Sequence, residues 1–172
     1  MSIALEAYTA EGLLTGAVVA DGRLIDLLFS TSSVTLDGAV VTPFAGPPER
    51  ADRRCGVDVD DLMVIVATAD TVTPFHAVWH AIAVDLGPYR VCGELPALPG
   101  FDPARALARA TGAYILLGRA SVELRNGGLA AGINEHAFVW VNRYAVDVVT
   151  SALELGLFFP GAQRAPAQHA IA

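Results

Sequence analysis

The chain has 172 residues and a formal net charge of -7. An acidic chain repels phosphate backbones, so we do not expect a nucleic acid partner. Hydrophobic residues make up 53% of the chain, yet no uninterrupted apolar run approaches the roughly 18–20 residues that a membrane-spanning helix needs. The start of the chain has no basic region followed by an apolar signal core, which predicts a soluble protein of the cytoplasm.

The first half predicts strands around one short helix. Asp21 stands where a helix N-cap would accept free backbone N–H groups, and Leu24, Leu27 and Leu28 give the helix one apolar face. The predicted elements are strands at 4–9 and 13–19, a helix of about two turns from 21, a strand at 34–41, a surface loop at 42–54, and a strand at 57–67 that bends near 60–61.

The second half predicts a similar series after a break at 68–74. Asp102 and Pro103 form a strong helix start, because proline at the first helical position loses no hydrogen bond. The predicted elements are strands at 75–85 and 89–95, a helix at 102–110, a strand at 114–124, a turn at 126–128, a strand at 138–149, an apolar segment at 151–159 and a frayed tail at 161–172.

The two halves match in the order and spacing of these elements. Gly16 and Gly93 lie 77 residues apart, the helices 80, the strands at 34–41 and 115–122 81, and the segments at 59–67 and 141–149 82. Every gap falls in a predicted loop, as true repeats require. We therefore expect a tandem duplication.

The expected fold class is α+β and mainly β. Residues 1–72 form the first strand–strand–helix–strand–strand unit, residues 73–150 the second, and residues 151–172 a C-terminal apolar segment with its tail. Each unit alone has a thin core, so we expect the two to pack as one pseudo-twofold body, either small-barrel-like or sandwich-like.

The helix of the first half carries a resemblance. Gly16, residues 23–28 and residues 34–39 resemble small bacterial β-rich domains of unknown function with a glycine after a strand, an Arg-Leu-Ser-Asp-Leu-Leu-Asn helix and a Phe-x-x-Leu-x-x-Ala strand. Ile25 and Phe29 replace the usual Ser and Asn. The second unit matches through Gly93, Leu107 and Ala120. The resemblance implies a small β-rich domain and brings no catalytic residues.

Candidate metal ligands are few. His76 and His80 would meet on one face of a helix, but on a strand their spacing places them about 13 Å apart. The acidic cluster of Asp58, Asp60 and Asp61 lacks the remaining ligands of a calcium loop and is more typical of a solvated strand edge. We expect no metal and no cofactor.

Catalytic motifs are also missing from the sequence. Cys55 and Cys92 are expected to be buried, inert thiols, and the chain has neither a Gly-x-Ser-x-Gly elbow nor a phosphate-binding glycine loop. We therefore expect a protein that is not an enzyme.

The apolar segment at 151–159 leaves two interpretations open. It either folds back to cap the core or forms an interface, because an exposed apolar patch usually finds a partner. The interface candidates are Leu153, Leu155, Leu157, Phe158 and Phe159. We expect an accessory, scaffold or adaptor protein that binds a protein partner or itself, within a larger assembly that can be membrane-associated. The alternative is a regulator that binds a small ligand or metal in the cleft between the units.

Overall fold

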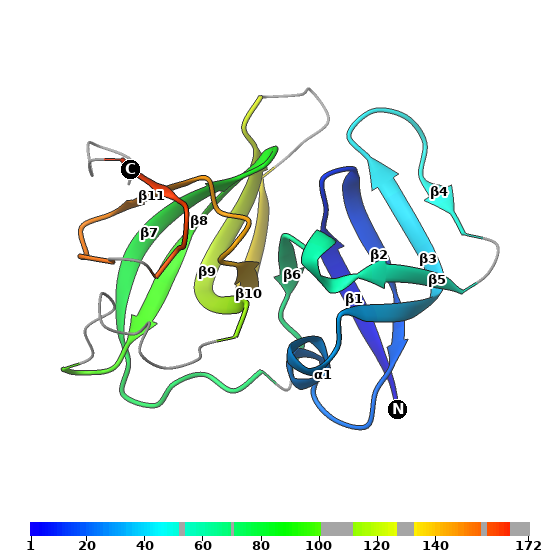
Figure 1. Cartoon of the computed structure of the whole chain (residues 1–172), viewed down its shortest axis with the longest axis horizontal. Coiled ribbons are helices and arrows are strands. Elements are labelled where there is room, and N and C mark those ends of the chain that lie inside the picture. The colour runs from blue at the N-terminus through cyan, green and yellow to red at the C-terminus, as the bar shows by residue number, and fades with distance from the viewer. Residues whose placement is uncertain (52–53, 70, 101–111, 127–132, 156–157, 166–172) are drawn as a thin grey trace. The chain divides into compact units, whose positions relative to one another are not determined.

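The computed structural model describes residues 1–51, 54–69, 71–100, 112–126, 133–155 and 158–165 (Figure 1). The fold is mainly β, as the sequence predicts: the described residues form twelve strands and one α-helix. The chain divides into two compact units, Met1–Thr71 and Val72–Ala172. Among the described residues, no helix is long and apolar enough to cross a membrane.

The first unit is an antiparallel sheet with one helix. Its elements are β1 (Ser2–Tyr8), β2 (Gly12–Val19), α1 (Leu24–Ser30), β3 (Ser33–Pro43), β4 (Glu49–Arg50), β5 (Cys55–Asp58), the 3₁₀ turn η1 (Val59–Asp61) and β6 (Val64–Val66). The strand order is β6-β1-β2-β3-β4, and β5 also pairs with β3. Leu5, Leu36, Leu62 and Ile65 form the centre of its core.

This sheet is open but strongly curled. Strand β5 lies beside β3 and β6 lies beside β1, so the two flank opposite sides of the β1-β2-β3 ribbon. On a flat sheet four strand spacings would separate them by about 19 Å. Only residues 59–63 join them, and a 3₁₀ turn shortens this link well below its extended reach of about 20 Å. The short link therefore requires a curved sheet.

Helix α1 differs from its prediction at the N-terminus. It begins at Leu24, and the N-cap residue is Arg23, which makes no side-chain capping hydrogen bond. Asp21 lies two residues before that cap, too far back to reach the first free N–H groups. Arg23 instead forms an ion pair with Asp26, with 2.7 Å between Nε and Oδ2.

Two predicted strands are each interrupted. The segment at 57–67 is divided into β5, η1 and β6, because the Asp58 carboxylate accepts a hydrogen bond from Asp60 N at 3.0 Å and closes a tight turn. The segment at 138–149 is divided in the same way, with Asn142 Oδ1 accepting from Tyr144 N at 3.1 Å. The predicted loop at 42–54 also contains the two-residue strand β4.

The second unit is a sheet in the order β12-β11-β7-β8-β9-β10. Its strands are β7 (Val78–Leu86), β8 (Tyr89–Ala97), β9 (Tyr114–Leu124), β10 (Asn134–Asn142), β11 (Val148–Ser151) and β12 (Gln163–Ala165). The β11–β12 pair is parallel and the other pairs are antiparallel. The predicted helix at 102–110 and most of the turn at 126–128 lie outside the described residues.

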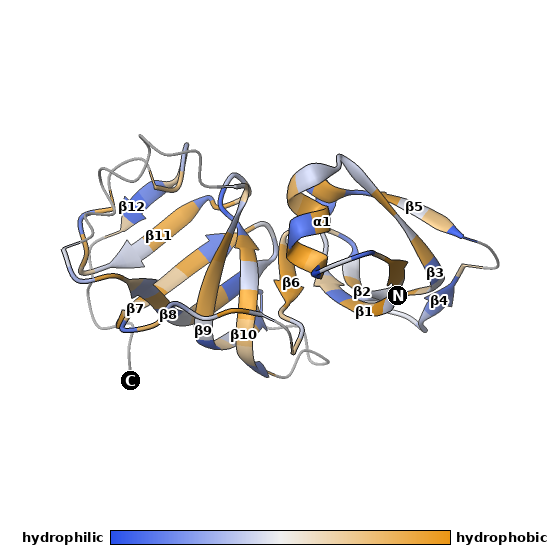
Figure 2. Ribbon diagram, turned by 90° about the horizontal axis from the view of Figure 1, so that it is seen from below, coloured by the Kyte–Doolittle hydropathy of each residue, from blue (hydrophilic) through white to orange (hydrophobic). Residues whose placement is uncertain are grey.

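Part of the tail predicted to be frayed is ordered as β12. Gln163–Ala165 pairs with β11, while residues 166–172 lie outside the described part of the chain. In Figure 2, β4 and β12 are largely hydrophilic, whereas β6 and β11 are largely hydrophobic. Charged residues on such short outer strands discourage pairing with other chains.

The two units have the same strand order and register. The order β6-β1-β2-β3-β5 in the first unit matches β11-β7-β8-β9-β10 in the second. Thr15 pairs with Val40 and Cys92 with Ser121, each just before a register shift. Partners in the first three strands lie 77 and 81 residues apart, as expected. The last two strands differ by 84, not 82: Val57 and Val141 are in register with residues 34 and 115.

Candidate functional site, a charged groove on the second unit

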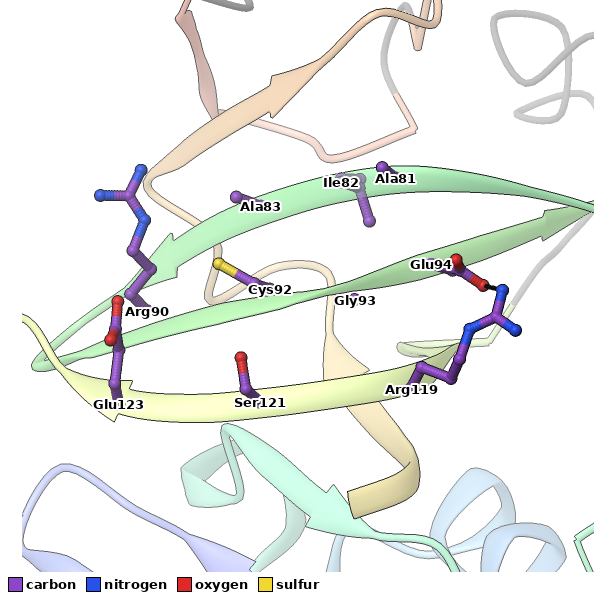
Figure 3. Close-up of a pocket in the computed structure, with 10 residues that line it drawn as sticks. All are labelled: Ala81, Ile82, Ala83, Arg90, Cys92, Gly93, Glu94, Arg119, Ser121 and Glu123. Atoms are coloured by element: carbon purple, nitrogen blue, oxygen red, sulfur yellow. Dashed lines mark hydrogen bonds and ion pairs between the residues drawn. The ribbon is translucent and has the colours of Figure 1, made fainter. Parts of the chain in front are cut away.

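A groove of about 620 Å³ lies on one face of β7, β8 and β9. Small residues form its floor, and charged residues lie at its two ends (Figure 3). The floor includes Ala81, Ala83, Cys92, Gly93 and Ser121. The strand period of two explains the arrangement, because Arg90, Cys92 and Glu94 line the groove while the intervening Val91 is buried in the core.

One end of the groove carries an ion pair between Glu94 of β8 and Arg119 of β9. In Figure 3 these two side chains reach toward one another across the strands. The Arg119 side chain is 74% exposed and that of Glu94 is 27% exposed. Because the guanidinium is so exposed, it remains accessible to a further acceptor.

The backbone at Arg119 is unusual. The register shift between β8 and β9 gives β9 one extra residue, and Arg119 lies there with φ of 45°. The first unit has the same bulge between β2 and β3, where the corresponding residue is Gly38 with φ of 63°. A left-handed backbone costs a residue other than glycine roughly 1–2 kcal/mol. Arg119 therefore occupies a position that the fold would fill best with glycine.

Aromatic side chains hold this bulge from the groove's neighbouring surface. Trp79 of β7 and Phe138 of β10 have ring centroids 6.1 Å apart. A Cβ atom built on Gly118 would lie 2.7 Å from the Trp79 ring and 3.2 Å from the Phe138 ring. No side chain fits at position 118, so close packing of the two rings positions the backbone that presents Arg119.

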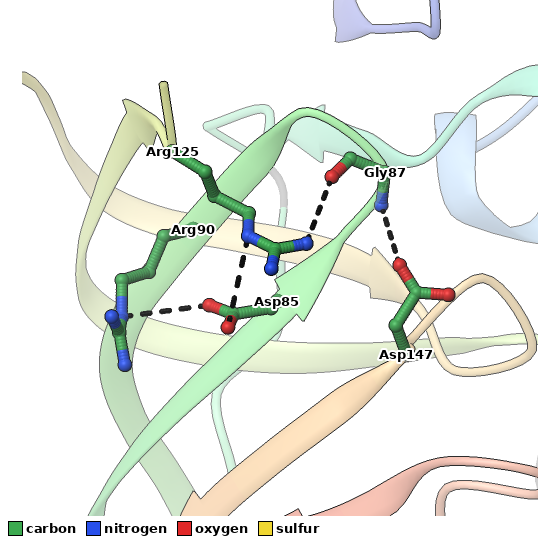
Figure 4. A network of polar contacts seen from close by, with 5 residues as sticks. All are labelled: Asp85, Gly87, Arg90, Arg125 and Asp147. Carbon is green, nitrogen blue, oxygen red and sulfur yellow. Dashed lines mark hydrogen bonds and ion pairs between the residues drawn. The ribbon is translucent and has the colours of Figure 1, made fainter. Parts of the chain in front are cut away.

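The opposite end of the groove is a network around Asp85 (Figure 4). Its two carboxylate oxygens lie 3.5 Å from Arg90 Nε and 3.8 Å from Arg125 Nε, and its side chain is 15% exposed. Arg125 also donates to Gly87 O at 3.3 Å, while Gly87 N donates to Asp147 at 3.0 Å. These contacts brace the β7–β8 turn and keep Arg90 at the end of the groove.

Cys92 lies at the centre of the groove floor. Burial raises the pKa of its thiol, and the neighbouring Arg90 offsets only part of that effect. The thiol therefore stays protonated at neutral pH, in which form it is a poor nucleophile. This chemistry suits a surface for binding more than one for covalent catalysis.

The matching face of the first unit has none of these charges. Leu13, Ala17, Gly38 and Thr42 stand at the positions of Arg90, Glu94, Arg119 and Glu123. The backbone is the same in the two units, so the fold itself does not require the charges. They are particular to the second unit.

The predicted metal candidates do not come together in a ligand set. His76 precedes β7 with φ of 61°, its ring 4.8 Å from that of Phe75, and His80 lies within β7. Among the described residues, no group of three or more His, Cys, Asp or Glu side chains could hold a metal. The alternative of a ligand in the cleft between the units stays a prediction.

The C-terminal candidates lie mostly inside the chain. Leu155, Phe158 and Phe159 are 3%, 5% and 3% exposed, Leu153 is half-buried, and Leu157 lies outside the described residues. The Phe158 ring lies 5.7 Å from the Arg143 guanidinium, which is itself buried. Apolar side chains covered by their own chain leave little area for a partner.

Sequence reasoning missed the groove. Its charged residues come from three strands and meet only when the register is known. The signal was present as charges at alternate positions, 90 and 94 on one strand and 119 and 123 on the next.

Comparisons of the chain with protein-family models, with curated protein sequences and with solved structures each found no match.

Proposed function

We propose that this protein is a non-enzymatic adaptor that binds a segment of a partner protein in the groove of its second unit. Arg119 is the observation that carries the proposal. An arginine held in a left-handed backbone is costly, and such strain is typical of functional positions. Its exposed guanidinium at the end of the groove gives a reason for the strain to persist.

The chemistry of the groove favours a polypeptide with charges of both signs. Of its charged lining residues, Arg90 and Arg119 are balanced by Glu94 and Glu123. The span from Arg90 to Glu94 along β8 is about 13 Å, the length of roughly four extended residues. The small floor residues leave room for the main chain of such a segment, and the Arg side chains supply donors for its carboxylates or carbonyl groups.

We further infer that the two units arose by tandem duplication. The shared strand order, the matching bulges and the two side-chain-capped turns at Asp58 and Asn142 support this inference. In this view the second unit acquired charges on a face that stays neutral in the first. The C-terminal segment, with Leu155, Phe158 and Phe159 buried, then serves to cap the second unit.

Peptide selection tests the proposed function. A phage-displayed library of random peptides is selected on the full chain and then rebound to the Arg119→Gly and Arg54→Gln variants. Arg54 is a matched control, since it is also an exposed arginine in an ion pair, 2.6 Å from Asp37. We expect the selected peptides to bind the Arg54→Gln variant normally and the Arg119→Gly variant poorly. Failure to enrich any peptide, or equal binding to both variants, would contradict the proposal.

A further inference from the structure

A second pocket lies within the first unit. It has a volume of about 320 Å³ and is enclosed by the β1–β2 turn, β3, β5 and the residues around η1. Leu14, Val41, Val57 and Met63 contribute apolar surface, and the carboxylates of Glu11, Asp60 and Asp61 lie at its rim. This volume is at the small end of ligand pockets and suits one or two side chains.

The apolar wall of this pocket is more open than the same positions in the second unit. Val41 and Val57 are half-exposed. Their counterparts, Val122 and Val141, are at most 1% exposed. Because the same backbone positions are closed in one unit and open in the other, the pocket leaves apolar area that a ligand would cover favourably.

The charge of the first unit indicates the kind of ligand. Residues 1–71 carry eleven acidic and four basic side chains, whereas residues 72–172 carry seven of each. The whole net charge of the chain therefore lies in the unit that holds this pocket. Glu11, Asp60 and Asp61 are exposed, so the rim attracts cations and repels carboxylates.

We propose that this pocket receives an apolar side chain flanked by basic residues on a partner protein. The apolar side chain enters between Val41, Val57 and Met63, and the flanking basic groups face the carboxylates of the rim. The site is separate from the groove of the second unit and uses different chemistry, since the groove is balanced in charge. A partner that engaged both units would gain affinity from the linkage of two modest contacts.

Three labelled peptides test this proposal on the full chain by fluorescence anisotropy. They are Gly-Arg-Leu-Arg-Gly, its charge-reversed form Gly-Glu-Leu-Glu-Gly, and Gly-Arg-Ser-Arg-Gly, which lacks the apolar side chain. We expect the first to bind, the second not to bind, and the third to bind about tenfold more weakly, since it buries no leucine. Raising salt from about 50 mM to about 1 M weakens the first peptide, because the rim charges are exposed.

Two charge-matched double variants localise the site. Asp60→Asn with Asp61→Asn removes charge at the rim, and we expect it to weaken the basic peptide about fivefold. Asp21→Asn with Glu49→Gln removes the same charge from exposed positions that do not line the pocket, and we expect little change. The Arg119→Gly variant keeps its affinity, which separates this site from the proposed groove. Equal effects of the two double variants, or no binding of the basic peptide up to ~1 mM, would overturn the proposal.

Discussion

Gly38 and Arg119 occupy the same bulge position in two units with the same strand order, and both have a left-handed backbone, with φ of 63° and 45°. The position is compatible with glycine at no steric cost and with arginine only under strain. One fold thus shows both the relaxed and the strained solution at one site. The difference separates what the backbone needs from what the groove presents.

Replacing Arg119 with glycine should leave stability almost unchanged while removing peptide binding. Relief of the left-handed strain, roughly 1–2 kcal/mol, offsets the greater freedom of glycine in the unfolded chain and the loss of an exposed ion pair. Arg119→Ala keeps the strain and loses the pair, so its free energy of unfolding should be about 1 kcal/mol lower than that of Arg119→Gly. Urea unfolding of the two variants measures this difference.

The first unit provides the reverse test of the same relationship. Gly38→Ala introduces a Cβ atom at a left-handed position with no neighbour within 4 Å, so only backbone strain is added. We expect a loss of about 1 kcal/mol in the free energy of unfolding. If Arg119→Gly and Arg119→Ala are equally stable and Gly38→Ala is neutral, the backbone strain at this bulge is negligible.

Gly118→Ala should destabilise the second unit. The new methyl group would lie 2.7 Å from the Trp79 ring and 3.2 Å from Phe138, so the rings or the bulge must move. Overpacking of this kind costs roughly 1–3 kcal/mol. Gly22→Ala is the control, because its Cβ would meet nothing within 4 Å. Trp fluorescence during thermal unfolding follows both variants, and equal melting temperatures would show that the rings adjust freely.

The strands were the most predictable part of this fold. The strand β9 (Tyr114–Leu124) agrees with its predicted bounds, because alternating apolar residues such as Ala120 and Val122 face the core. The breaks within longer strands were less predictable. Asp58 and Asn142 look like ordinary polar strand residues, and only the structure shows their side chains capping a turn.

The groove was not predictable from composition or motifs. Glu94 and Arg119 lie 25 residues apart and meet because β8 and β9 pair with a register shift. The bulge itself is hidden in the sequence, since Arg119 replaces the glycine that marks the same bulge at Gly38. A sequence pattern records which residues alternate along a strand, but register and bulges decide which of them become neighbours.

The Cys92 thiol should react slowly with iodoacetamide in the folded protein. Burial raises its pKa, so the reactive thiolate forms only at higher pH than in the unfolded chain. Alkylation of a Cys55→Ser variant, measured against pH, isolates this thiol. We expect the midpoint to fall when the protein is unfolded in urea. Between the unfolded and folded pKa values only the unfolded chain has lost the proton, so the free energy of unfolding falls as pH rises. Identical folded and unfolded profiles would show an accessible thiol.

Phe158→Ala distinguishes a core role from an interface role for the C-terminal segment. Phe158 is 5% exposed, and its ring contacts that of Phe159 at 5.4 Å between centroids and lies over buried Arg143. If the segment caps the second unit, the variant should lose roughly 3–5 kcal/mol in the free energy of unfolding. Urea unfolding measures this loss, and light scattering measures association in the same samples. Glu154→Gln, which removes only an exposed ion pair with Arg164, is the control and should change stability little. A stable Phe158→Ala variant with reduced association would instead favour an interface, because side chains that serve a partner leave the fold of the free chain intact.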